Sequence, residues 1–437
     1  MALYRHFART RMKDRLLVGL DLGTSHIRIA VGQLVVGQDK RVSLQLIGAS
    51  EAVSQGISKG NITSLEDAVS AISTCLEQAE RIIGLPISEA TVGIGGTSIT
   101  TQLAKGVIGV SRPDGDVRAE DAARAIEAAR ALVNPANQEI LHVLPRTYSV
   151  DGQGGIKDPV GMHGIRLEVE AQIVQGLSSH IRNLTKAVFR TGLDISELVY
   201  VPLATAEAVA TSRDRELGVC VITIGASTSG VSIYEDGELL HAATLPIGAD
   251  HITSDIAIGL RISLEAAERI KCQCGTANAE DVPKRGEEID VAQFGAEQSE
   301  LVPIRYVAEI IEARVEEIFE KVDAELKRIA RQGMLPAGVI LTGGGAKLPG
   351  MIEVAKRMLR LPCSMGKMTM LSSMPEVISD PAFSTAVGLV LWSYERERRD
   401  ESDRPSHNAR PSGGGHAKNV LNKVKSPISK LFRSFIP

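Results

Sequence analysis

A carboxylate and two hydroxyls lie close together at the end of the first apolar segment of the chain. The segment Val18–Leu22 contains Asp21, and Gly23, Thr24 and Ser25 follow it before an alternating apolar segment begins. This pattern predicts a β-hairpin whose tip presents backbone N–H groups and hydroxyls. Consecutive amides at such a tip form a concave anion site that suits phosphate oxygens.

The same pattern recurs in the second half of the chain. Val221–Ile224 is followed by Gly225, Ser227 and Thr228, and then by another alternating segment. Two hairpins of one design indicate a duplicated fold that holds a nucleotide from two sides. The second hairpin has Thr223 where a carboxylate would repeat, which raises the question of whether a bound nucleotide is hydrolysed.

A third segment joins a buried strand to a glycine turn. Val339–Thr342 is followed by Gly343, Gly344 and Gly345, and a helix is expected after them. A backbone without Cβ atoms can approach a flat or charged ligand closely, and a helix N-terminus adds a positive dipole. The turn matches neither a Walker loop nor a dinucleotide-binding fingerprint, and a plain strand-to-helix turn also explains it. The order of the three segments is more specific than any one of them.

The elements that must position these residues alternate between strands and helices, which predicts an α/β architecture. Strands are expected at residues 16–22, 26–34, 42–50, 90–95, 107–110, 139–150, 165–174, 196–201 and 337–342. Helices are expected at residues 65–83, 118–133, 178–191, 249–260, 263–273, 303–332, 350–360 and 382–398. The character of the chain changes between about 98 and 170, where a small α+β insertion is expected.

Composition narrows the classes of protein that fit. The chain has 437 residues, of which 43% are hydrophobic, so it can build sizeable cores. A formal net charge of -4 gives no general case for nucleic-acid binding. The five cysteines form no C-x-x-C pair, so a zinc site is not expected. No apolar run approaches the roughly 18 residues of a membrane-spanning helix.

The three segments together resemble the signature of the actin/DnaK-type ATPase superfamily from about residue 16 to 394. Within it, the chain is similar to the FtsA family of bacterial division proteins at Leu141–Pro145, Gly161–Glu168, Ala308–Arg314 and Leu341–Gly350. The resemblance implies an α/β, actin-like (ribonuclease H-like) two-half fold with an inserted small α+β domain of the 1C or SHS2 type. The expected parts are a first half (16–95), the inserted domain (96–175), a second half (176–398), a flexible linker (399–418) and an amphipathic helix (419–437).

The resemblance also implies that ATP and Mg²⁺ bind between the two halves. Asp21 would act on the water shell of the Mg²⁺, because this ion keeps several waters when it meets a lone carboxylate. Both hairpin tips would contact the phosphates, through Gly23, Thr24, Ser25, Gly225, Ser227 and Thr228.

On the adenosine side, the resemblance implies contacts from the glycine turn and from the helix expected at 263–273. Gly343, Gly344 and Gly345 would approach the adenosine, Glu268 would bind the ribose hydroxyls and Lys271 would flank the base. Glu268 and Lys271 are three residues apart and share a helix face. A solvated ion pair is the alternative interpretation of these two residues.

The second phosphate loop departs from the family pattern. It normally reads Asp-Ile-Gly-Gly-Gly-Thr-Thr-Asp or similar, whereas this chain has Thr223 at the first position and Gly230 at the last. Loss of both acids should leave ATP binding intact and slow its turnover, so at most a weak ATPase is expected. Glu207 is the one remaining candidate for orienting water, and a structural surface glutamate is the alternative.

The last segment of the chain has the composition of a membrane-binding helix. Apolar residues recur there at helical spacing, the other face is basic and no acid occurs from 418 to 437. Pro427 interrupts the pattern, so a short turn at 419–425 and a main helix at 427–435 are expected. A helix that packs on its own domain is the alternative. The residues expected to bind lipid are Val420, Leu421, Val424, Lys425, Ile428, Lys430, Leu431, Phe432, Arg433 and Phe435.

Partners follow from the resemblance. It implies self-assembly into filaments, docking of the C-terminal peptide of FtsZ near Arg314 and Glu317, and contacts of later divisome proteins with the inserted domain. The expected location is the cytoplasmic face of the inner membrane at the division septum, as a peripheral protein. A small-molecule kinase and an actin-like scaffold of a pilus or secretion system are the alternatives, and neither is expected to end in such a basic helix.

Overall fold

The computed structural model describes residues 16–36, 42–112, 114–133, 136–283, 286–368 and 376–402. The chain forms two compact units, Met1–Glu395 and Arg396–Pro437. The predicted lipid-binding residues, from Val420 to Phe435, lie outside the described residues. The last described helix, α11 (Ser384–Ser402), extends past the predicted start of the linker at 399, and the remainder of that linker is also outside the described residues.

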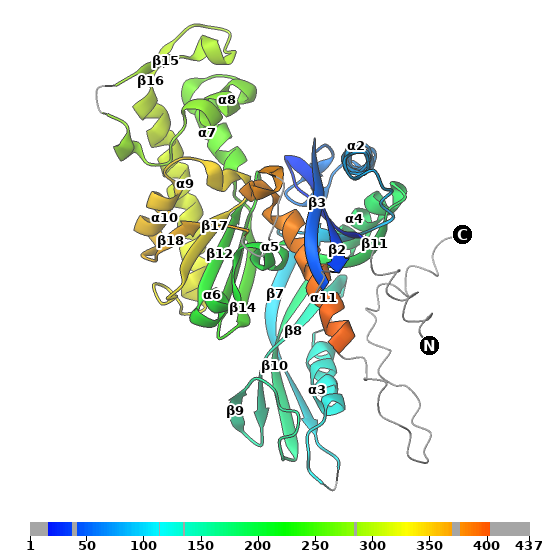
Figure 1. The fold of residues 1–437 in the computed structure, drawn as a ribbon. Helices are drawn as coiled ribbons and strands as arrows, with labels where there is room; N and C mark the ends of the chain where they lie inside the picture. The colour runs from blue at the N-terminus through cyan, green and yellow to red at the C-terminus, as the bar shows by residue number, and fades with distance from the viewer. Residues whose placement is uncertain are drawn as a thin grey trace. The chain divides into compact units, whose positions relative to one another are not determined.

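The first half is built on a five-stranded mixed sheet (Figure 1). In spatial order its strands are β11 (Asp194–Tyr200), β6 (Glu89–Ile94), β1 (Leu16–Leu22), β2 (His26–Val36) and β3 (Val42–Val53). β1 and β2 form the predicted hairpin, in which Asp21 pairs with Arg28. β6 runs parallel to both β1 and β11, so the sheet mixes hairpin and crossover connections.

Helices enclose this sheet from both faces. α2 (Leu65–Ile83) packs on β3, where a Cβ on Gly48 would lie 2.6 Å from Ile83. Strand register places Gly19 of β1 on the opposite face, and a Cβ there would lie 2.2 Å from the carbonyl oxygen of Ala386 in α11. α4 (Ser178–Arg190) packs beside α2. Glycine at position 19 therefore allows α11 to lie directly on β1.

The second half repeats the design around a second five-stranded sheet. In spatial order its strands are β14 (Glu238–Leu245), β13 (Ser229–Glu235), β12 (Val219–Ile224), β17 (Gly338–Thr342) and β18 (Cys363–Met365). β12 and β13 form the second predicted hairpin, and β12 runs parallel to β17. The glycine turn follows β17, so it and the hairpin tip lie at the same edge of the sheet.

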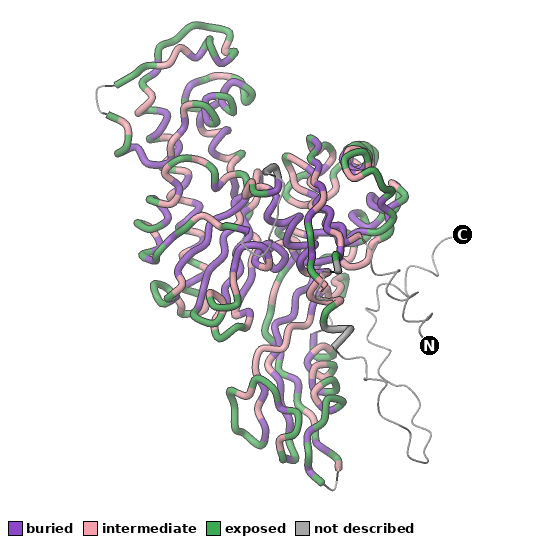
Figure 2. Tube along the Cα trace, viewed as in Figure 1, coloured by how far each residue is buried: buried purple, intermediate pink, exposed green. Residues whose placement is uncertain are grey.

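Four helices of the second half largely match their predicted ranges: α7 (Ala249–Leu260), α8 (Leu264–Cys274), α9 (Ile304–Arg328) and α10 (Met351–Leu359). Two further helices, α5 (Val201–Val209) and α6 (Ser212–Leu217), had no predicted range. The apolar residues that recur at helical spacing along α9 are buried from Val307 to Leu326, and buried residues gather along both sheets (Figure 2). α9 ends earlier than the predicted 332, because Ala330 adopts a left-handed conformation with φ 55°.

The inserted domain is a four-stranded sheet covered by one helix. Its strands are β7 (Ile99–Gly109), β10 (Arg166–Leu177), β8 (Gln138–Val150) and β9 (Gln153–Ile156), and its helix is α3 (Ala119–Ala131). β7 is longer than the predicted 107–110, because it pairs with β10 along its whole length despite its polar residues. The absence of a side chain at Gly106 allows α3 to pack closely on β7, because a Cβ there would lie 2.0 Å from the carbonyl oxygen of Ala125.

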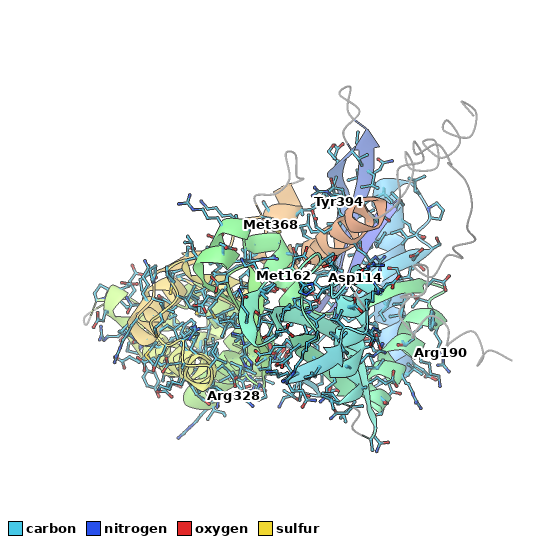
Figure 3. The ribbon with its side chains drawn as sticks, turned by 90° about the horizontal axis from the view of Figure 1, so that it is seen from below. Asp114, Met162, Arg190, Arg328, Met368 and Tyr394 are labelled. Atoms are coloured by element: carbon cyan, nitrogen blue, oxygen red, sulfur yellow. The ribbon has the colours of Figure 1, made fainter. Side chains whose placement is uncertain are left out.

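Buried polar contacts join these parts. Thr101 of β7 donates to the carbonyl oxygen of Ala242 in β14 (2.7 Å). The ring of His142 in β8 accepts a hydrogen bond from the amide of Tyr200 (3.1 Å) and meets the ring of Trp392 in α11 edge-on. Near the end of the same helix, Tyr394 donates to the carbonyl of β3's first residue (3.1 Å; Figure 3). α11 therefore contacts both the first half and the inserted domain.

Candidate nucleotide site

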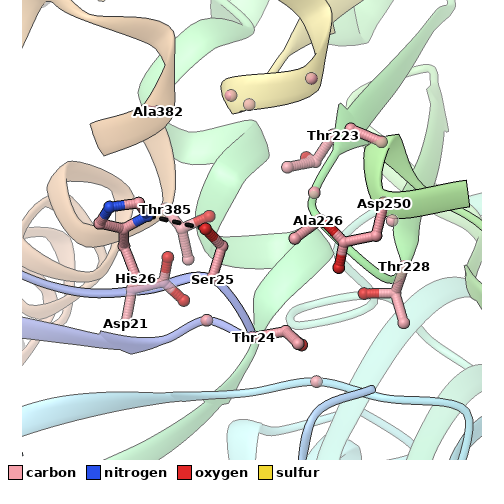
Figure 4. A pocket seen from close by; sticks show the side chains of 18 of the residues that line it. Asp21, Thr24, Ser25, His26, Thr223, Ala226, Thr228, Asp250, Ala382 and Thr385 are labelled. Atoms are coloured by element: carbon pink, nitrogen blue, oxygen red, sulfur yellow. Dashed lines mark hydrogen bonds between the residues drawn. The ribbon is translucent and has the colours of Figure 1, made fainter. Parts of the chain in front are cut away.

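A cavity of about 570 Å³ opens where the two hairpin tips, the glycine turn and α8 meet (Figure 4). The structure brings most of the predicted nucleotide-binding residues into its lining: Asp21, Gly23, Thr24, Ser25, Gly225, Thr228, Glu268, Lys271, Gly343, Gly344 and Gly345. Two predicted residues, Ser227 and Glu207, do not line it. The two hairpin tips, the glycine turn and α8 are far apart in the sequence. They therefore converge on one site in the fold, as the hairpin pattern predicted.

The first hairpin tip is shaped by Gly23, where a Cβ would lie 2.5 Å from the carbonyl oxygen of His26. A side chain at this position would force the tip open. The hydroxyl of Ser25 lies 2.8 Å from Nδ1 of His26. Burial and the nearby Arg28 lower the pKa of His26, which favours the neutral ring. The Ser25 hydroxyl can therefore donate to this ring while its oxygen lines the cavity (Figure 4).

Asp21 lies at the base of this tip in a partly dehydrated environment. Burial raises the pKa of its carboxyl to about 6, and the positive charge of Arg28 offsets part of that effect. Arg28 also lines the cavity, where it pairs with Glu51 (3.1 Å) and lies over the ring of Phe383. A cation that bound near Asp21 would favour its charged form. Arg28 is not among the predicted site residues, although the predicted hairpin already places it in the strand next to Asp21.

The second hairpin tip is a tight turn closed by a hydrogen bond from the amide of Gly225 to the carbonyl of Thr228 (2.9 Å). Thr223 and Thr228 face the cavity (Figure 4). Within the described residues, neither hydroxyl forms a hydrogen bond with the protein, so both are free to meet a ligand. Ser227 is buried and donates to Asp250 instead (3.1 Å).

Asp250 is a cavity residue that sequence reasoning missed. It is the second residue of α7, and its carboxylate faces the cavity beside the second tip. The sequence predicts that this helix begins at 249. It does not predict that the first turn of the helix packs against the hairpin tip, because that contact forms only in the tertiary structure. Among the described residues that line the cavity, the carboxylates are therefore Asp21, Asp250 and Glu268.

The three glycines of the turn differ in what surrounds the position that a Cβ would occupy. Gly343 has φ 88°, and a Cβ there would lie 2.5 Å from the carbonyl oxygen of Ile224. Gly345 packs on the same residue, with a Cβ position 2.6 Å from the Ile224 side chain. At Gly344 the nearest atom would be the Ala382 Cβ at 3.9 Å, so this residue faces open space. Two of the glycines are needed for packing, and Gly344 leaves room for a ligand.

Glu268 and Lys271 form a close pair on the cavity wall, in which the lysine is buried and the glutamate side chain is 48% exposed. Their charged atoms lie 2.6 Å apart, and Lys271 is only 8% exposed. Thr253 of α7 donates to Glu268 (2.5 Å) and accepts from Lys271 (2.8 Å). Burial alone would raise the pKa of Glu268, but the hydrogen bonds from Lys271 and Thr253 outweigh it and hold the pKa below its usual value. The pair is therefore fixed in place and charged.

Glu207 lies outside the cavity, on α5. Its carboxylate pairs with Arg215 (2.8 Å), and that guanidinium lies over the ring of Tyr234. The residues of α5 that do line the cavity are Val201 and Pro202 at its first turn. The structure thus places an apolar side chain, and no acid, where the connecting helix approaches the two tips.

The predicted partner-binding residues lie on α9, away from the cavity. Arg314 binds both carboxylate oxygens of Asp255 in α7 (2.5 and 2.9 Å) and also contacts Glu317. The guanidinium is therefore already engaged. On the same two helices, Ile258 of α7 and Tyr306 of α9 are exposed apolar residues, at 76% and 45%.

Comparisons with known proteins agree with this architecture. The family model described as "Cell division protein FtsA" matches residues 220–388, and the model "SHS2 domain inserted in FTSA" matches residues 96–175. The FtsA of Pseudomonas aeruginosa is 34% identical over 384 residues, covering 88% of this chain and 90% of that protein. The FtsA of Bacillus subtilis is 35% identical over 385 residues, covering 88% of this chain and 85% of that protein.

Solved structures show the same fold at low sequence identity. A chain of a PilM–PilN type IV pilus biogenesis complex aligns with TM-score 0.62 and 16% identity, over 86% of this chain and 98% of that one. MreB5 of Spiroplasma citri, bound to ADP, aligns with TM-score 0.51 and 12% identity, over 89% and 99%.

The predicted actin-like α/β fold with an inserted SHS2 domain is confirmed. In the described part of the chain, no helix is both long and apolar enough to span a membrane. With about a third of its residues shared with curated relatives across most of its length, the chain belongs to the FtsA family of cell division proteins.

Proposed function

We propose that this chain binds ATP with Mg²⁺ in the cavity, assembles into filaments in that state and tethers FtsZ filaments to the membrane during division. The observation that carries the proposal is the convergence of two hairpin tips, a glycine turn and the Glu268–Lys271 pair on one cavity. Two opposed tips with free amides and hydroxyls suit a polyphosphate. The fixed and charged Glu268–Lys271 pair suits a ribose, and the free space at Gly344 suits the base.

The roles of the individual residues follow from where they lie. Thr24 and Thr228 would hold the phosphates from opposite sides, and Glu268 would accept from the ribose hydroxyls while Gly344 lets the base approach. Mg²⁺, when bound, neutralises phosphate charge and orients water around it. Asp21 fits this ion because its carboxylate is held at a strand end facing the cavity, where burial makes its charged form depend on a nearby cation.

We further propose that bound ATP is turned over slowly. Thr223 replaces the acid of the second hairpin, and Val201 stands at the first turn of α5. Valine has no polar group, and a threonine hydroxyl can bind a water but is too weak a base to take a proton from it. Removing a preorganised catalytic group of this kind commonly lowers a rate by about 10²–10³. Bound ATP would then act as a ligand that holds the two halves in one polymerising shape.

The proposed docking surface for the FtsZ peptide is formed by Ile258 and Tyr306, together with Arg314. The exposed apolar residues would bind the apolar residues of the peptide. An acidic residue of the peptide would compete with Asp255 for the Arg314 guanidinium, as carboxylates do for a bidentate donor. Apolar contacts therefore contribute more to the affinity than the arginine, whose existing ion pair must be exchanged.

This docking surface is tested by peptide binding in solution. Ile258→Glu should weaken binding of an FtsZ C-terminal peptide at least tenfold, and Arg314→Glu should weaken it less. Ile82→Glu is a matched control, because Ile82 is also exposed but lies on α2 of the other half. Unchanged affinity in Ile258→Glu would contradict the assignment.

The inserted domain is the proposed site for later divisome proteins. Leu103 and Val107 on β7 and Ile165 before β10 are exposed apolar residues, and β7 is an edge strand of its sheet. Exposed apolar groups on an edge strand suit a protein partner.

Membrane attachment is assigned to the basic amphipathic segment 419–437 on its sequence pattern. Each basic residue near anionic lipid contributes about 1 kcal/mol, and a single short anchor binds weakly. A filament joins many anchors and so raises the avidity. The whole proposal is tested by adding FtsZ to anionic vesicles with this protein and ATP. FtsZ should pellet with the vesicles only when the protein and ATP are both present, and recruitment without them would overturn the proposal.

A further inference from the structure

The first turn of α7 is fastened directly to the tip of the second hairpin. The amide of Ala249 donates to the carbonyl of Gly225 (2.9 Å), and the amide of Asp250 donates to the carbonyl of Ala226 (2.8 Å). A Cβ on Gly248 would lie 2.5 Å from the Ala226 oxygen, so the two backbones are in direct contact. Asp250 therefore moves as one piece with the hairpin that carries Thr223.

The carboxylate of Asp250 is oriented but not neutralised. Its Oδ2 accepts a hydrogen bond from the Ser227 hydroxyl (3.1 Å). Within the described residues, its Oδ1 accepts no hydrogen bond and no cationic side chain pairs with it. Figure 4 shows this carboxylate on the wall of the cavity opposite Asp21 and Ser25. An uncompensated negative charge thus faces the space between the two tips.

We propose that Asp250 contacts the water shell of Mg²⁺ on bound ATP from the side opposite Asp21, which strengthens nucleotide binding without replacing the catalytic acid that the second hairpin lacks. The inference rests on the proposed function of this cavity. A carboxylate beside a polyphosphate is repulsive unless a cation stands between them. Mg²⁺ keeps several waters and is held by one or two carboxylates together with phosphates. Asp250 would therefore make ATP binding dependent on Mg²⁺.

A purely structural role for Asp250 gives a different result. An acid in the first turn of a helix stabilises the helix through its dipole, and the Ser227 hydrogen bond holds the tip. Loss of that role would weaken ATP binding by the same factor whether or not Mg²⁺ is present. The electrostatic role predicts that loss of the carboxylate weakens ATP binding in Mg²⁺ but leaves it unchanged or strengthens it without Mg²⁺. Without the cation, the carboxylate only repels phosphate.

The test is calorimetric titration of the full chain with ATP, in excess Mg²⁺ and separately in excess EDTA. In Mg²⁺, Asp250→Asn should raise the Kd about tenfold, which corresponds to about 1.4 kcal/mol. In EDTA, the same variant should bind ATP as tightly as the unaltered chain or more tightly. Ser227→Ala is the matched control, since it removes the same hydrogen bond without changing charge, and it should keep the ratio of the two Kd values.

A second variant guards against simple misfolding. Adding Thr223→Asp to Asp250→Asn returns a carboxylate to the hairpin and should restore the Mg²⁺ dependence of the Kd. Equal shifts of the Kd in Mg²⁺ and EDTA, or no shift in either, would overturn the inference and leave the proposed function standing. Absence of ATP binding by the unaltered chain would overturn both.

Discussion

Asp21 and Thr223 stand at equivalent places in the two hairpins, each two residues before the glycine of its tip. One position keeps a carboxylate whose charge depends on a nearby cation, and the other carries a hydroxyl that no protein group binds within the described residues. The Glu268–Lys271 pair is fixed by Thr253 on the adenosine side. At the scale of single residues, these features support the proposed binding of a nucleotide with slow turnover.

Glu268 gives the sharpest prediction at this scale. Glu268→Gln should weaken ATP binding about fivefold to tenfold, because a charge-assisted hydrogen bond to a ribose hydroxyl contributes roughly 1–1.5 kcal/mol more than a neutral one. The variant should bind a deoxyribose triphosphate that lacks the contacted hydroxyl with nearly unchanged affinity. Competition titration of both nucleotides measures this.

Glu265→Gln on the same helix is the control, since its side chain is 87% exposed and outside the cavity. Equal loss of affinity for both nucleotides in Glu268→Gln would show that Glu268 supports the wall of the cavity without contacting the ribose.

Individual cavity residues were predictable only where they belong to a local pattern. Asp21, Gly225 and Gly343 sit in strand-and-turn segments that the sequence displays directly. Asp250 and Arg28 did not stand out, because their contribution depends on how α7 and β2 return to the tips. Glu207 was proposed from its place on the connecting helix, but the helix turns this side chain towards Arg215.

At the scale of elements, α11 connects the cavity to the rest of the first half. Thr385 in its first turn lines the cavity and shares a hydrogen bond with Thr205 of α5 (3.0 Å). Ser384 contacts Thr342 at the end of β17, and Ser393 contacts Thr91 of β6 (2.6 Å). One helix therefore touches strands of both halves, and its close packing is a condition for holding them together.

Gly388 tests that packing. A Cβ at this position would lie 1.8 Å from the carbonyl oxygen of Ala204 in α5, so Gly388→Ala must push the two helices apart. We expect the free energy of unfolding to fall by about 1–3 kcal/mol, as overpacking of a core does. Gly154→Ala is the control, because nothing lies within 4 Å of its Cβ position. Urea denaturation that finds the two variants equally stable would contradict the packing argument.

The joint between β8 and α11 should be sensitive to acid. Burial lowers the pKa of His142 to about 4, below the value of about 6.5 expected in the unfolded chain. Between pH 4 and pH 6.5 the unfolded chain binds more protons at His142 than the folded chain does. The contribution of His142 to the free energy of unfolding is therefore fully present above pH 6.5 and is lost as the pH falls towards 4.

The expected loss of unfolding free energy at pH 5 is about 2 kcal/mol relative to pH 7. Denaturation at both pH values, compared with His142→Gln, measures the contribution of His142. The variant keeps an acceptor for the Tyr200 amide but does not titrate, so its stability should change less with pH. An equal change in both proteins would contradict the assignment.

Elements with a clear period were predicted well, and those shaped by neighbours were not. The strand expected at 165–174 and the helix expected at 303–332 both form, and in both the periodic apolar residues, such as Leu167 and Ile173, are the buried ones. β7 was predicted too short, since Thr100, Thr101 and Gln102 carry no apolar signal and are strand residues only because β10 pairs with them.

At the scale of the whole molecule, the comparisons place the chain in the FtsA family of cell division proteins. The sequence identified this family from three short motifs and two insertion segments, because their order along the chain is preserved even where the second hairpin has lost its acids. It did not reveal that Arg314 is already paired with Asp255, since α7 and α9 come together only in the folded second half.

Phe432 tests membrane attachment of the assembled protein. Phe432→Glu should remove most binding to anionic vesicles, because a charge replaces a large apolar side chain on the lipid-facing side and many anchors are weakened at once. Ser429→Glu adds the same charge away from the apolar face and should retain most of the binding. Vesicle sedimentation with ATP measures both, and co-pelleting of Phe432→Glu at the unaltered level would refute the anchor.

We propose that ATP holds the two halves in a polymerising shape without being consumed. One experiment that follows both vesicle sedimentation and phosphate release from labelled ATP in the same sample tests this directly. ATP, and not ADP, should drive the protein onto anionic vesicles, while far less than one phosphate per bound nucleotide is released during assembly. Phosphate release that keeps pace with assembly, or equal sedimentation with ADP, would contradict it.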